Sequence, residues 1–432
     1  MPTARGWLTI GLGAAMWAAG RMFGSSPLEQ IGFALLILVV IATVIVNSRR
    51  HQLEIHRTVT PERARSGQPV HVKLTIGNEG RGSAPLLLLD DKIPLELAGN
   101  ARFALNGVEP GGRRETTYEL RPPRRGRYDI GPLEISFVDP FGLAQTHFEV
   151  TGTTSLLVHP RIETLSLPRD LGHQRSMSVS ALRQLSGARG EDFYTLREYV
   201  EGDDLRKIHW PSTAKRAKPM IRQEEMPWHT RATILLDDRL DLRDGFDDSS
   251  SFEGCVEAAA SLADLYHRSG YSFRVVGAIN SGVPQSRGGQ HFHRCLDMLA
   301  VITTQRNGDG MEHDRMLIRL AQLEGGTSGE GTLVVVTGNL NAECALAVSR
   351  CRRRFRQVVT IVFPAHRFGS EGTRDRWEGE RRIHESIGLL SRSGVRTLVL
   401  GPGESLASGW SSMTARSLRG GARTWDPRPE PA

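Results

Sequence analysis

Residues 190–225 read GEDFYTLREYVEGDDLRKIHWPSTAKRAKPMIRQEE, and the pattern of the chain changes across this stretch. Before it, apolar and polar residues alternate with a period of two, which is typical of β-strands. After it, short apolar runs alternate with segments of helical periodicity, which indicates an α/β fold. The stretch itself is dense in charges, aromatic side chains and turn residues. We therefore predict that residues 166–227 connect two domains of different fold class.

The size and charge of the chain limit the classes of protein to consider. Its 432 residues are too many for one ordinary core and suffice for two or three domains. The formal net charge of +7 would allow an anionic partner such as nucleic acid or lipid headgroups. Arginine is spread along the whole chain rather than gathered in one basic helix, so we expect no nucleic-acid partner.

The cysteine pattern indicates a reducing compartment. The four cysteines lie in the C-terminal half without a CxxC pair; they are Cys255, Cys295, Cys344 and Cys351. Scattered cysteines of this kind are typical of packed, reduced thiols in a cytosolic domain. The spacing HFHRC, from His291 to Cys295, resembles part of a metal site. Because no second ligand pair at metal spacing accompanies it, we predict no metal there.

Two apolar runs near the N-terminus predict a transmembrane hairpin of two short helices at residues 1–50. Residues 7–20 are uncharged and mostly apolar or small, and residues 31–46 are apolar apart from Thr43. At about 1.5 Å per residue these runs reach only ~20–25 Å, so flanking residues such as Met22, Phe23 and Leu28 must help to span a ~30 Å hydrocarbon core. Two alternatives remain, namely that the first run is a cleaved signal peptide and that the second is a buried core helix.

Charges next to the apolar runs predict the orientation of this hairpin. The arginines that follow the second run are Arg49, Arg50, Arg57, Arg63 and Arg65. The turn between the runs has only Arg21, which Glu29 opposes. The excess of positive charge on cytoplasmic loops places both ends of the hairpin inside. We therefore expect an inner (plasma) membrane anchor with the soluble domains in the cytoplasm.

Residues 51–165 predict an antiparallel β-sandwich of the immunoglobulin-like kind. Alternating apolar positions occur at 70–76 and 133–137, and residues 86–89 form a short continuous apolar run. Strong turn signals separate these runs, including Asn106-Gly107 and Asp139-Pro140-Phe141-Gly142. Short strands at such spacing are typical of sandwiches. Modules of this kind bind partners or act as spacers, and the pattern does not separate the two.

Residues 228–403 predict an α/β domain with a mostly parallel sheet. Strands are expected at 232–236, 272–279, 332–337, 358–363 and 396–400, and helices at 252–265, 292–302, 316–323, 342–353 and 381–391. Strands that alternate with helices imply right-handed crossovers. The remaining residues, 404–432, are rich in Ser, Gly, Arg and Pro, and we predict a flexible tail.

In such sheets the functional crevice lies at the carboxyl ends of the strands. The order of strands and helices resembles a von Willebrand factor A domain, which carries at this place a D-x-S-x-S motif that helps to hold Mg²⁺. Asp237 matches the Asp, but Arg239 and Asp241 stand at the two Ser positions. A guanidinium repels a cation and can pair with Asp237 or Asp241. We therefore predict a degenerate motif that binds no metal.

Other catalytic motifs are missing from the sequence. There is no G-x-x-x-x-G-K-[ST] phosphate loop and no G-x-S-x-G nucleophile elbow. We therefore assign no catalytic residue and no cofactor, and we expect a chain that does not hydrolyse ATP by itself.

The opening stretch closely resembles the signature of the domain of unknown function 58 family. The matching residues are Gly190, Asp192, Phe193, Leu196, Arg197, Tyr199, Gly202, Asp203, Arg206, Ile208, His209, Trp210, Ala214 and Lys215. Residues 125–143, the N-terminal hairpin and the α/β region also match the family layout. The resemblance implies a bacterial membrane-anchored protein with a von Willebrand factor A-like cytoplasmic domain. It also implies association with MoxR-type AAA+ ATPases and with transglutaminase-like membrane proteins.

The signature residues themselves allow two interpretations. We expect a helical piece through Lys215 and an extended segment at 218–222. The candidate binding residues are Arg197, Tyr199, Asp203, Arg206, His209, Trp210 and Lys215. Near-balanced charges at short range favour an internal salt-bridge network that braces the domains. The alternative is a docking surface with Trp210 and Tyr199 as anchors.

The prediction for function is a membrane-anchored, non-enzymatic scaffold that engages a cytoplasmic AAA+ ATPase. One alternative is a metal-dependent or hydrolytic enzyme that uses Asp237, Asp241 and His209, which requires these groups to lie within hydrogen-bond reach of one another. A weaker alternative is the binding of nucleic acid or anionic lipid through basic residues.

Overall fold

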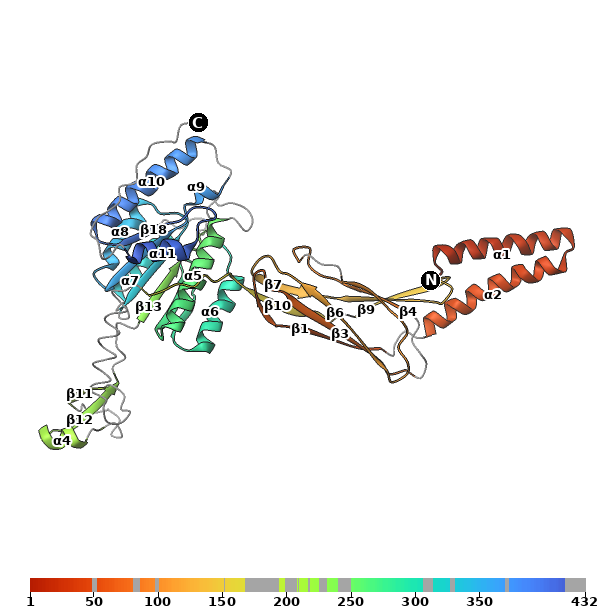
Figure 1. The fold of residues 1–432 in the computed structure, drawn as a ribbon, viewed down its shortest axis with the longest axis horizontal. Helices are drawn as coiled ribbons and strands as arrows, with labels where there is room; N and C mark the ends of the chain where they lie inside the picture. Colours follow the sequence, from red (N-terminus) through yellow and green to blue (C-terminus); the bar gives the residue numbers. More distant parts are fainter. Residues whose placement is uncertain are drawn as a thin grey trace. The chain divides into compact units, whose positions relative to one another are not determined.

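The computed structural model describes residues 1–48, 53–80, 86–97, 101–150, 152–167, 194–198, 208, 210–216, 218–224, 231–239, 250–305, 314–326, 331–369 and 373–415. The chain divides into two compact units, residues 1–160 and residues 161–432 (Figure 1).

The first unit begins with two helices, α1 (Ala4–Phe23) and α2 (Ser26–Ser48). The side chain of Thr3 caps α1 by accepting a hydrogen bond from the Gly6 amide, and Gly24 ends the helix with a φ of 68°. The helices contain 20 and 23 residues. At 1.5 Å per residue they are about 30 and 35 Å long. Both therefore extend beyond the apolar runs, as expected from the flanking apolar residues.

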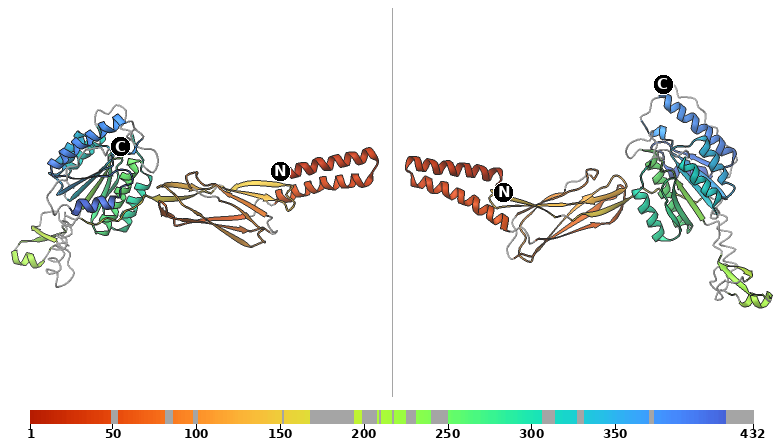
Figure 2. Two further views of the ribbon diagram at one scale, coloured as in Figure 1. Left: turned by 45° about the horizontal axis from the view of Figure 1, so that its top comes forward. Right: turned by 180° about the vertical axis from the view of Figure 1, so that it is seen from behind.

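Glycines bring the two helices into close contact. Gly13 and Gly20 are buried on α1, and a Cβ added to them would lie 3.0 Å from the carbonyl oxygen of Gly32 and 2.6 Å from the amide nitrogen of Glu29 of α2, respectively. A Cβ added to Gly32 would lie 2.6 Å from the carbonyl oxygen of Gly13 and 2.6 Å from the amide nitrogen of Trp17. Both atoms belong to the backbone, so only glycine permits this approach. The helices lie side by side in every view (Figure 2).

Among the described helices, α2 alone is long and apolar enough to cross a membrane, over Ser26–Asn47. A signal sequence or a buried helix would pass the same test. Two apolar spans were predicted, and only one of the two helices, α2, meets the criteria for a span. The other helix, α1, is less apolar because it carries Arg5, Arg21 and several glycines.

The rest of the first unit is an antiparallel β module, as predicted for residues 51–165. Its strands are β1 (Leu53–Thr60), β2 (Arg63–Arg65), β3 (Val70–Asn78), β4 (Leu86–Asp91), β5 (Arg102–Leu105), β6 (Arg113–Leu120), β7 (Gly126–Ile130), β8 (Leu133–Val138), β9 (Gln145–Val150) and β10 (Thr154–His159). They form sheets in the orders β1-β3-β6, β2-β10-β7 and β5-β4-β8-β9. Only the short pairing of β2 with β10 is parallel. The inward-facing residues of all three sheets share one hydrophobic core.

A buried ion pair connects the strands of this module. Arg57 on β1 donates to both carboxylate oxygens of Asp91 at the end of β4, at 3.1 and 2.5 Å. It also donates to the carbonyls of Ile130 and Gly152, and the Tyr118 hydroxyl donates to Asp91 at 2.6 Å. The two charged side chains are 7% and 0% exposed. Arg57 is therefore wrongly counted among the membrane-flanking charges, because its charge is neutralised inside the β module.

The second unit contains a six-stranded, mostly parallel sheet, which confirms the predicted α/β class. The strand order is β15-β14-β13-β16-β17-β18, and only the edge strand β15 is antiparallel. The strands are β13 (Arg231–Leu236), β14 (Ser272–Gly277), β15 (Val283–Ser286), β16 (Thr332–Thr337), β17 (Gln357–Val362) and β18 (Arg396–Val399). The helices are α5 (Ser251–Arg268), α6 (Gly289–Val301), α7 (Arg315–Gly325), α8 (Ala342–Cys351), α9 (Ala365–Phe368), α10 (Thr373–Arg392) and α11 (Leu406–Ala415).

Helices cover both faces of this sheet. Residues of α5, α6 and α11 share a core with one face, and residues of α7, α8 and α10 share a core with the other. Successive residues of β13 point alternately into the two cores, with Ile234 and Leu236 in the first and Leu235 in the second. This arrangement explains why the strands read as continuous apolar runs.

The flexible tail was predicted to begin at residue 404, but the residues that follow form helix α11. Leu406 and Trp410 of α11 are buried in the core, and the Trp410 ring nitrogen donates to the carbonyl of Ser166 at 2.7 Å. The small polar residues of this region indicated disorder, yet apolar side chains at helical spacing bind it to the sheet. Of the predicted tail at 404–432, residues 404–415 are described and residues 416–432 are not.

Part of the signature folds as a small hairpin with a helix. Strand β11 (Tyr194–Glu198) pairs antiparallel with β12 (Met220–Glu224), and α4 (Trp210–Arg216) lies between them in the sequence. The amide of Met220 donates to the Thr213 hydroxyl at 3.0 Å, which attaches α4 to β12. The predicted helical piece and the extended segment after it are thus both present.

Candidate functional site

The topology of the sheet marks one place for a site. From β13 the chain crosses through α5 to β14, whereas from β16 it crosses through α8 to β17, on the opposite side. The neighbouring strands β13 and β16 therefore flank the point where the winding direction reverses. Ligands of open α/β sheets bind at such points, at the carboxyl ends of the strands. Here these ends carry Asp237 and Thr337.

The Arg239 guanidinium occupies this point. Its Nε and Nη2 donate to the two carboxylate oxygens of Asp237, each at 2.7 Å, and its Nη1 donates to Asp314. Nη2 also donates to the carbonyl of Asn339 at 3.3 Å. The Thr337 hydroxyl donates to Asp237 Oδ2 at 2.6 Å. The cation of this site is therefore a side chain of the protein itself.

Burial and charge set the protonation of this cluster. The side chains of Arg239 and Asp237 are 11% and 4% exposed. Burial alone would lower the pKa of Arg239, but the hydrogen bond and the charge of Asp237 outweigh it and raise that pKa. Burial also raises the pKa of the neighbouring Cys344 thiol to about 12, although the charge of Arg239 opposes this shift. The cluster thus holds a permanent cation and a neutral thiol near pH 7.

The contacts agree with the pairing of Arg239 and Asp237 predicted from the sequence. Asp241 lies outside the described residues. The second carboxylate partner is Asp314, which sequence reasoning missed. It caps the N-terminus of α7 by accepting from the Met316 amide, and an Asp directly before a helix was its visible signal.

The neighbouring Asp238 has a structural role. It is fully buried, and its carboxylate accepts hydrogen bonds from the amides of Ile279 and Asn280 and from the Asn280 side chain, at 2.6–3.0 Å. These donors fix the loop that follows β14. No group of three His, Cys, Asp or Glu side chains that could hold a metal ion occurs among the described residues.

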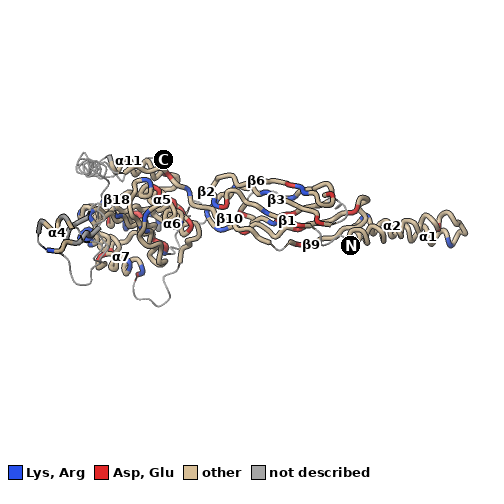
Figure 3. Tube along the Cα trace, turned by 90° about the horizontal axis from the view of Figure 1, so that it is seen from below, with Lys and Arg blue, Asp and Glu red and all other residues tan. Residues whose placement is uncertain are grey.

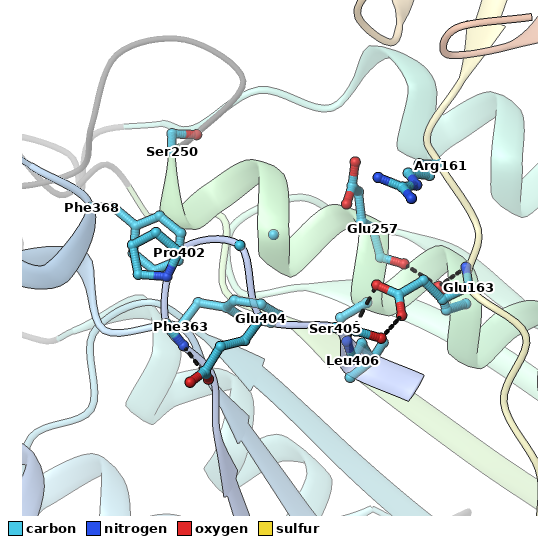
Figure 4. A pocket seen from close by; sticks show the side chains of 15 residues that line it. Arg161, Glu163, Ser250, Glu257, Phe363, Phe368, Pro402, Glu404, Ser405 and Leu406 are labelled. Carbon is cyan, nitrogen blue, oxygen red and sulfur yellow. Dashed lines mark hydrogen bonds between the residues drawn. The ribbon is translucent and has the colours of Figure 1, made fainter. Parts of the chain in front are cut away.

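A second feature of the carboxyl edge is a pocket of about 300 Å³ in the α/β unit. It is lined by the first turns of α5, by Phe363 after β17 and by residues 401–406 after β18 (Figure 4). Glu163, from the segment that enters the unit, points into the N-terminus of α11. Its carboxylate accepts from the Ser405 hydroxyl and from the amides of Leu406 and Ala407, at 2.6–3.2 Å. The Glu163 carboxylate and the first amides of α11 therefore satisfy each other as a helix cap at this end of the pocket.

The structure places only some of the predicted binding residues. Trp210 begins α4 and is 69% exposed, and Arg197 lies on β11 opposite Ile221. Lys215 belongs to α4. The remaining candidates, Tyr199, Asp203, Arg206 and His209, lie outside the described residues. The proposed convergence of His209, Asp237 and Asp241 and the bracing salt-bridge network therefore both stay predictions.

The two possible ligands at the ends of the HFHRC segment, His291 and Cys295, belong to the core. His291 Nε2 lies 2.8 Å from the carbonyl oxygen of Phe273, which requires the nitrogen to carry a proton and to donate. Burial lowers the pKa of His291 and raises that of the Cys295 thiol to about 12. Both groups are thus neutral packing residues. The four cysteines are all free and buried, as expected.

Comparison with known families adds the identity of the region around β11 to α9. Residues 195–367 match the model described as "Protein of unknown function DUF58". Residues 195–367 are therefore a DUF58 region. Among curated proteins, this chain is 24% identical over 309 residues to the uncharacterized protein YeaD of Bacillus subtilis strain 168. The alignment covers 68% of this chain and 75% of YeaD.

Two solved structures each match about a quarter of this chain. The CARDB domain of a Pyrococcus furiosus protein, solved with di-metal ions, is 15% identical with a TM-score of 0.19, and the match covers 25% of this chain and 90% of that domain. A putative ApaA protein from Bordetella pertussis is 17% identical with a TM-score of 0.20, and the match covers 24% and 93% of the two chains.

Proposed function

We propose that this DUF58 protein is a membrane-tethered, non-enzymatic scaffold that docks a cytoplasmic AAA+ ATPase of the MoxR type. In this proposal α1 and α2 form the anchor, the immunoglobulin-like β module is a spacer, and the von Willebrand factor A-like unit carries the docking surface. A transglutaminase-like membrane protein is a second expected partner. The observation that carries the proposal is the exposure of Trp210 at the start of α4.

Trp210 has the properties of a binding anchor. Tryptophan side chains are highly buried on average, and tryptophan is enriched among the residues that dominate binding energy at interfaces. Trp210 is exposed although α4 is held to β12 through Thr213 and Met220, the latter fully buried. A large apolar side chain on a fixed helix loses little conformational freedom when a partner covers it.

The Arg239 cluster supports a binding role rather than a catalytic one. Asp237 is engaged by Arg239 and Thr337, which leaves it poorly placed to act as a general base or a metal ligand. A guanidinium also repels any divalent cation at this point. The crevice that serves catalysis in many α/β enzymes is therefore filled by an ion pair.

The helix pair supports a two-helix anchor. Large apolar side chains face outward on both helices, among them Trp7, Leu8 and Trp17 on α1 and Phe33 and Val40 on α2. Glycines on both helices let the helix backbones approach closely, as is common for helices packed in lipid. Thr3 at the start of α1 is hydrogen-bonded to the β module, into which α2 also leads. Both ends of the pair are thus on the side of the β module, as expected for a hairpin that crosses the bilayer twice.

The docking proposal is tested with two matched tryptophan variants. Trp377 on α10 is 67% exposed, nearly as much as Trp210. Tagged wild-type, Trp210→Ala and Trp377→Ala chains would be crosslinked in membranes and purified, and AAA+ ATPases would be identified by mass spectrometry. We expect Trp210→Ala to lower recovery about thirtyfold, as for a hot-spot residue worth about 2 kcal/mol, and Trp377→Ala to leave it unchanged. Absence of an ATPase from the wild-type sample, or equal recovery with Trp210→Ala, would refute the proposal.

A further inference from the structure

The loop between β8 and β9 has an unusual distribution of polar and apolar side chains. Asp139 is buried, and its carboxylate accepts hydrogen bonds from the amides of Phe141 and Ala144 at 2.9 and 2.5 Å. Its own amide donates to the carbonyl of Ala144 at 3.1 Å. The apolar side chain of Phe141, in contrast, is 66% exposed. The hydrogen bonds of a buried carboxylate thus hold a phenylalanine outward.

The same loop holds the start of α1. The Thr3 amide donates to the carbonyl of Leu143 at 2.9 Å, and the Thr3 hydroxyl donates to the carbonyl of Gly142 at 2.6 Å. A Cβ on Gly6 would lie 2.1 Å from the Leu143 carbonyl oxygen, so this contact also requires glycine on the helix. Phe141 is therefore fixed next to the first turn of α1.

The surroundings of Phe141 have the composition of a bilayer interface. Arg5 is exposed, and its guanidinium lies 3.8 Å from where a Cβ of Gly142 would be. Trp7 and Leu8, which follow on α1, are also exposed. Surfaces that lie on a bilayer combine Trp, Phe or Leu side chains, which enter the headgroup boundary, with basic residues. An arginine at that level can pair with phosphate groups while its stem stays among apolar groups. The charged residues of both signs elsewhere on the β module are interspersed along its strands, whereas α1 and α2 carry few (Figure 3).

We infer that the loop from Asp139 to Ala144 contacts the bilayer surface, with the Phe141 ring in the headgroup region and Arg5 on lipid phosphates. The inference rests on the proposed anchor, because α1 must enter the membrane at this point. It adds that the β module lies against the membrane at one defined end, so that the loop fixes how the module leaves the bilayer.

Site-specific labelling of the full chain tests this contact. The four native cysteines are buried, so an introduced surface cysteine can be labelled selectively. Phe141→Cys would carry an environment-sensitive fluorophore, and the chain would be reconstituted in bilayers containing anionic lipid and lipids with a nitroxide near the headgroup. Leu95→Cys is the matched control, because Leu95 is fully exposed. The loop with Phe141 follows Val138, which pairs with the first residue of β4, whereas Leu95 follows Asp91, the last residue of β4. Phe33→Cys on α2 reports the anchor itself.

The three labels separate the possible results. We expect quenching at positions 33 and 141 that is at least threefold stronger than at position 95. Quenching of the label at position 33, with equal quenching at positions 141 and 95, would overturn the inference and leave the anchor in place. The same conclusion would hold if another part of the protein shielded position 141 from the lipid. No quenching at 33 would show that the anchor itself is wrong. Unchanged near-UV circular dichroism of Phe141→Cys serves as the check that the loop variant is folded.

Discussion

Arg239 donates to both carboxylate oxygens of Asp237 at 2.7 Å and to Asp314, so two acidic side chains at the edge of the sheet share one internal cation. A fixed guanidinium differs from a bound metal ion in that it cannot dissociate or exchange. The carboxyl edge of this sheet therefore keeps the same charge whatever the concentration of divalent cations around it.

Removal of this cation should destabilise the sheet and create a response to magnesium. Arg239→Ala leaves Asp237 buried without its counterion, which we expect to cost about 3 kcal/mol of unfolding free energy. Millimolar Mg²⁺ should raise the melting temperature of the variant and leave the wild type unchanged. Arg350→Ala, which removes a surface pair with Glu324, should cost less than about 1 kcal/mol. A saturable Mg²⁺ response of the wild type, measured by calorimetry, would show that Arg239 does not replace a metal.

Two adjacent aspartates on β4 should differ sharply in their contribution to stability. Asp91 is buried and paired with Arg57, whereas Asp90 is paired with Arg102 at the surface. We expect Asp91→Ala to lower the unfolding free energy by about 3 kcal/mol, because it leaves an unpaired buried guanidinium. Asp90→Ala should change it by less than about 0.5 kcal/mol. Thermal unfolding of both variants measures the difference, and equal losses would contradict the assigned role of Arg57.

The contact of Glu163 with α11 should depend on pH. Burial raises the pKa of Glu163, but hydrogen bonds from Ser405, Ala407 and Leu406 outweigh it, and the pKa is lowered from its ordinary value of about 4.5. A lowered pKa means that the stabilisation is complete above pH 4.5 and is lost as the pH falls through the lower folded value. Glu163→Gln should therefore destabilise α11 by about 1 kcal/mol at pH 7, as for loss of a cap. Hydrogen exchange of α11 amides in wild type and variant should converge at low pH; a difference that persists there would exclude the carboxylate as its cause.

Two glycines of the helix pair should respond differently to the same substitution. A Cβ at Gly32 would lie 2.6 Å from backbone atoms of α1, whereas at Gly11 no atom lies within 4 Å. Gly32→Leu should separate the helices, and Gly11→Leu should leave them in contact. Disulfide crosslinking between cysteines introduced at facing positions of α1 and α2 would measure this. Efficient crosslinking in Gly32→Leu would argue against the close packing.

The native thiols should resist modification. Burial raises the pKa of the Cys295, Cys344 and Cys351 thiols to about 12. Since the thiolate is the reactive form, we expect no labelling by maleimide at pH 7 in the folded chain and labelling of four thiols after denaturation. Rapid labelling of the folded chain would mean that one of these thiols is accessible.

Much of the fold follows from local patterns. The boundaries of β16 agree with the predicted strand at 332–337. A short, continuous apolar run between polar residues indicates a strand whose two faces are both covered by helices. The antiparallel edge strand β15 was missed, since its four residues, Val283–Ser286, carry no clear periodicity. The prediction also missed α11, because composition outweighed the spacing of Leu406 and Trp410.

The candidate site could be predicted only in part. Asp237 and Arg239 are two positions apart in the sequence. Their pairing could therefore be predicted from the D-x-S-x-S motif in which Arg239 replaces the first Ser. Asp314 comes from a distant helix start, and its approach to Arg239 depends on the path of the chain between β15 and β16. Similarly, Arg57 was counted as a membrane-flanking charge because its burial depends on Asp91, which comes from another sheet.

The contact of Thr3 with Gly142 also bears on the order in which the protein is made. A ribosome delivers α1 and α2 long before the loop after β8, since 139 positions separate the two residues. Under the proposed anchor, the helices enter the membrane while Thr3 still has no partner in the loop. The contact can form only once β8 and β9, the strands on both sides of the loop, have been made, so it joins the helix pair to a domain that folds later.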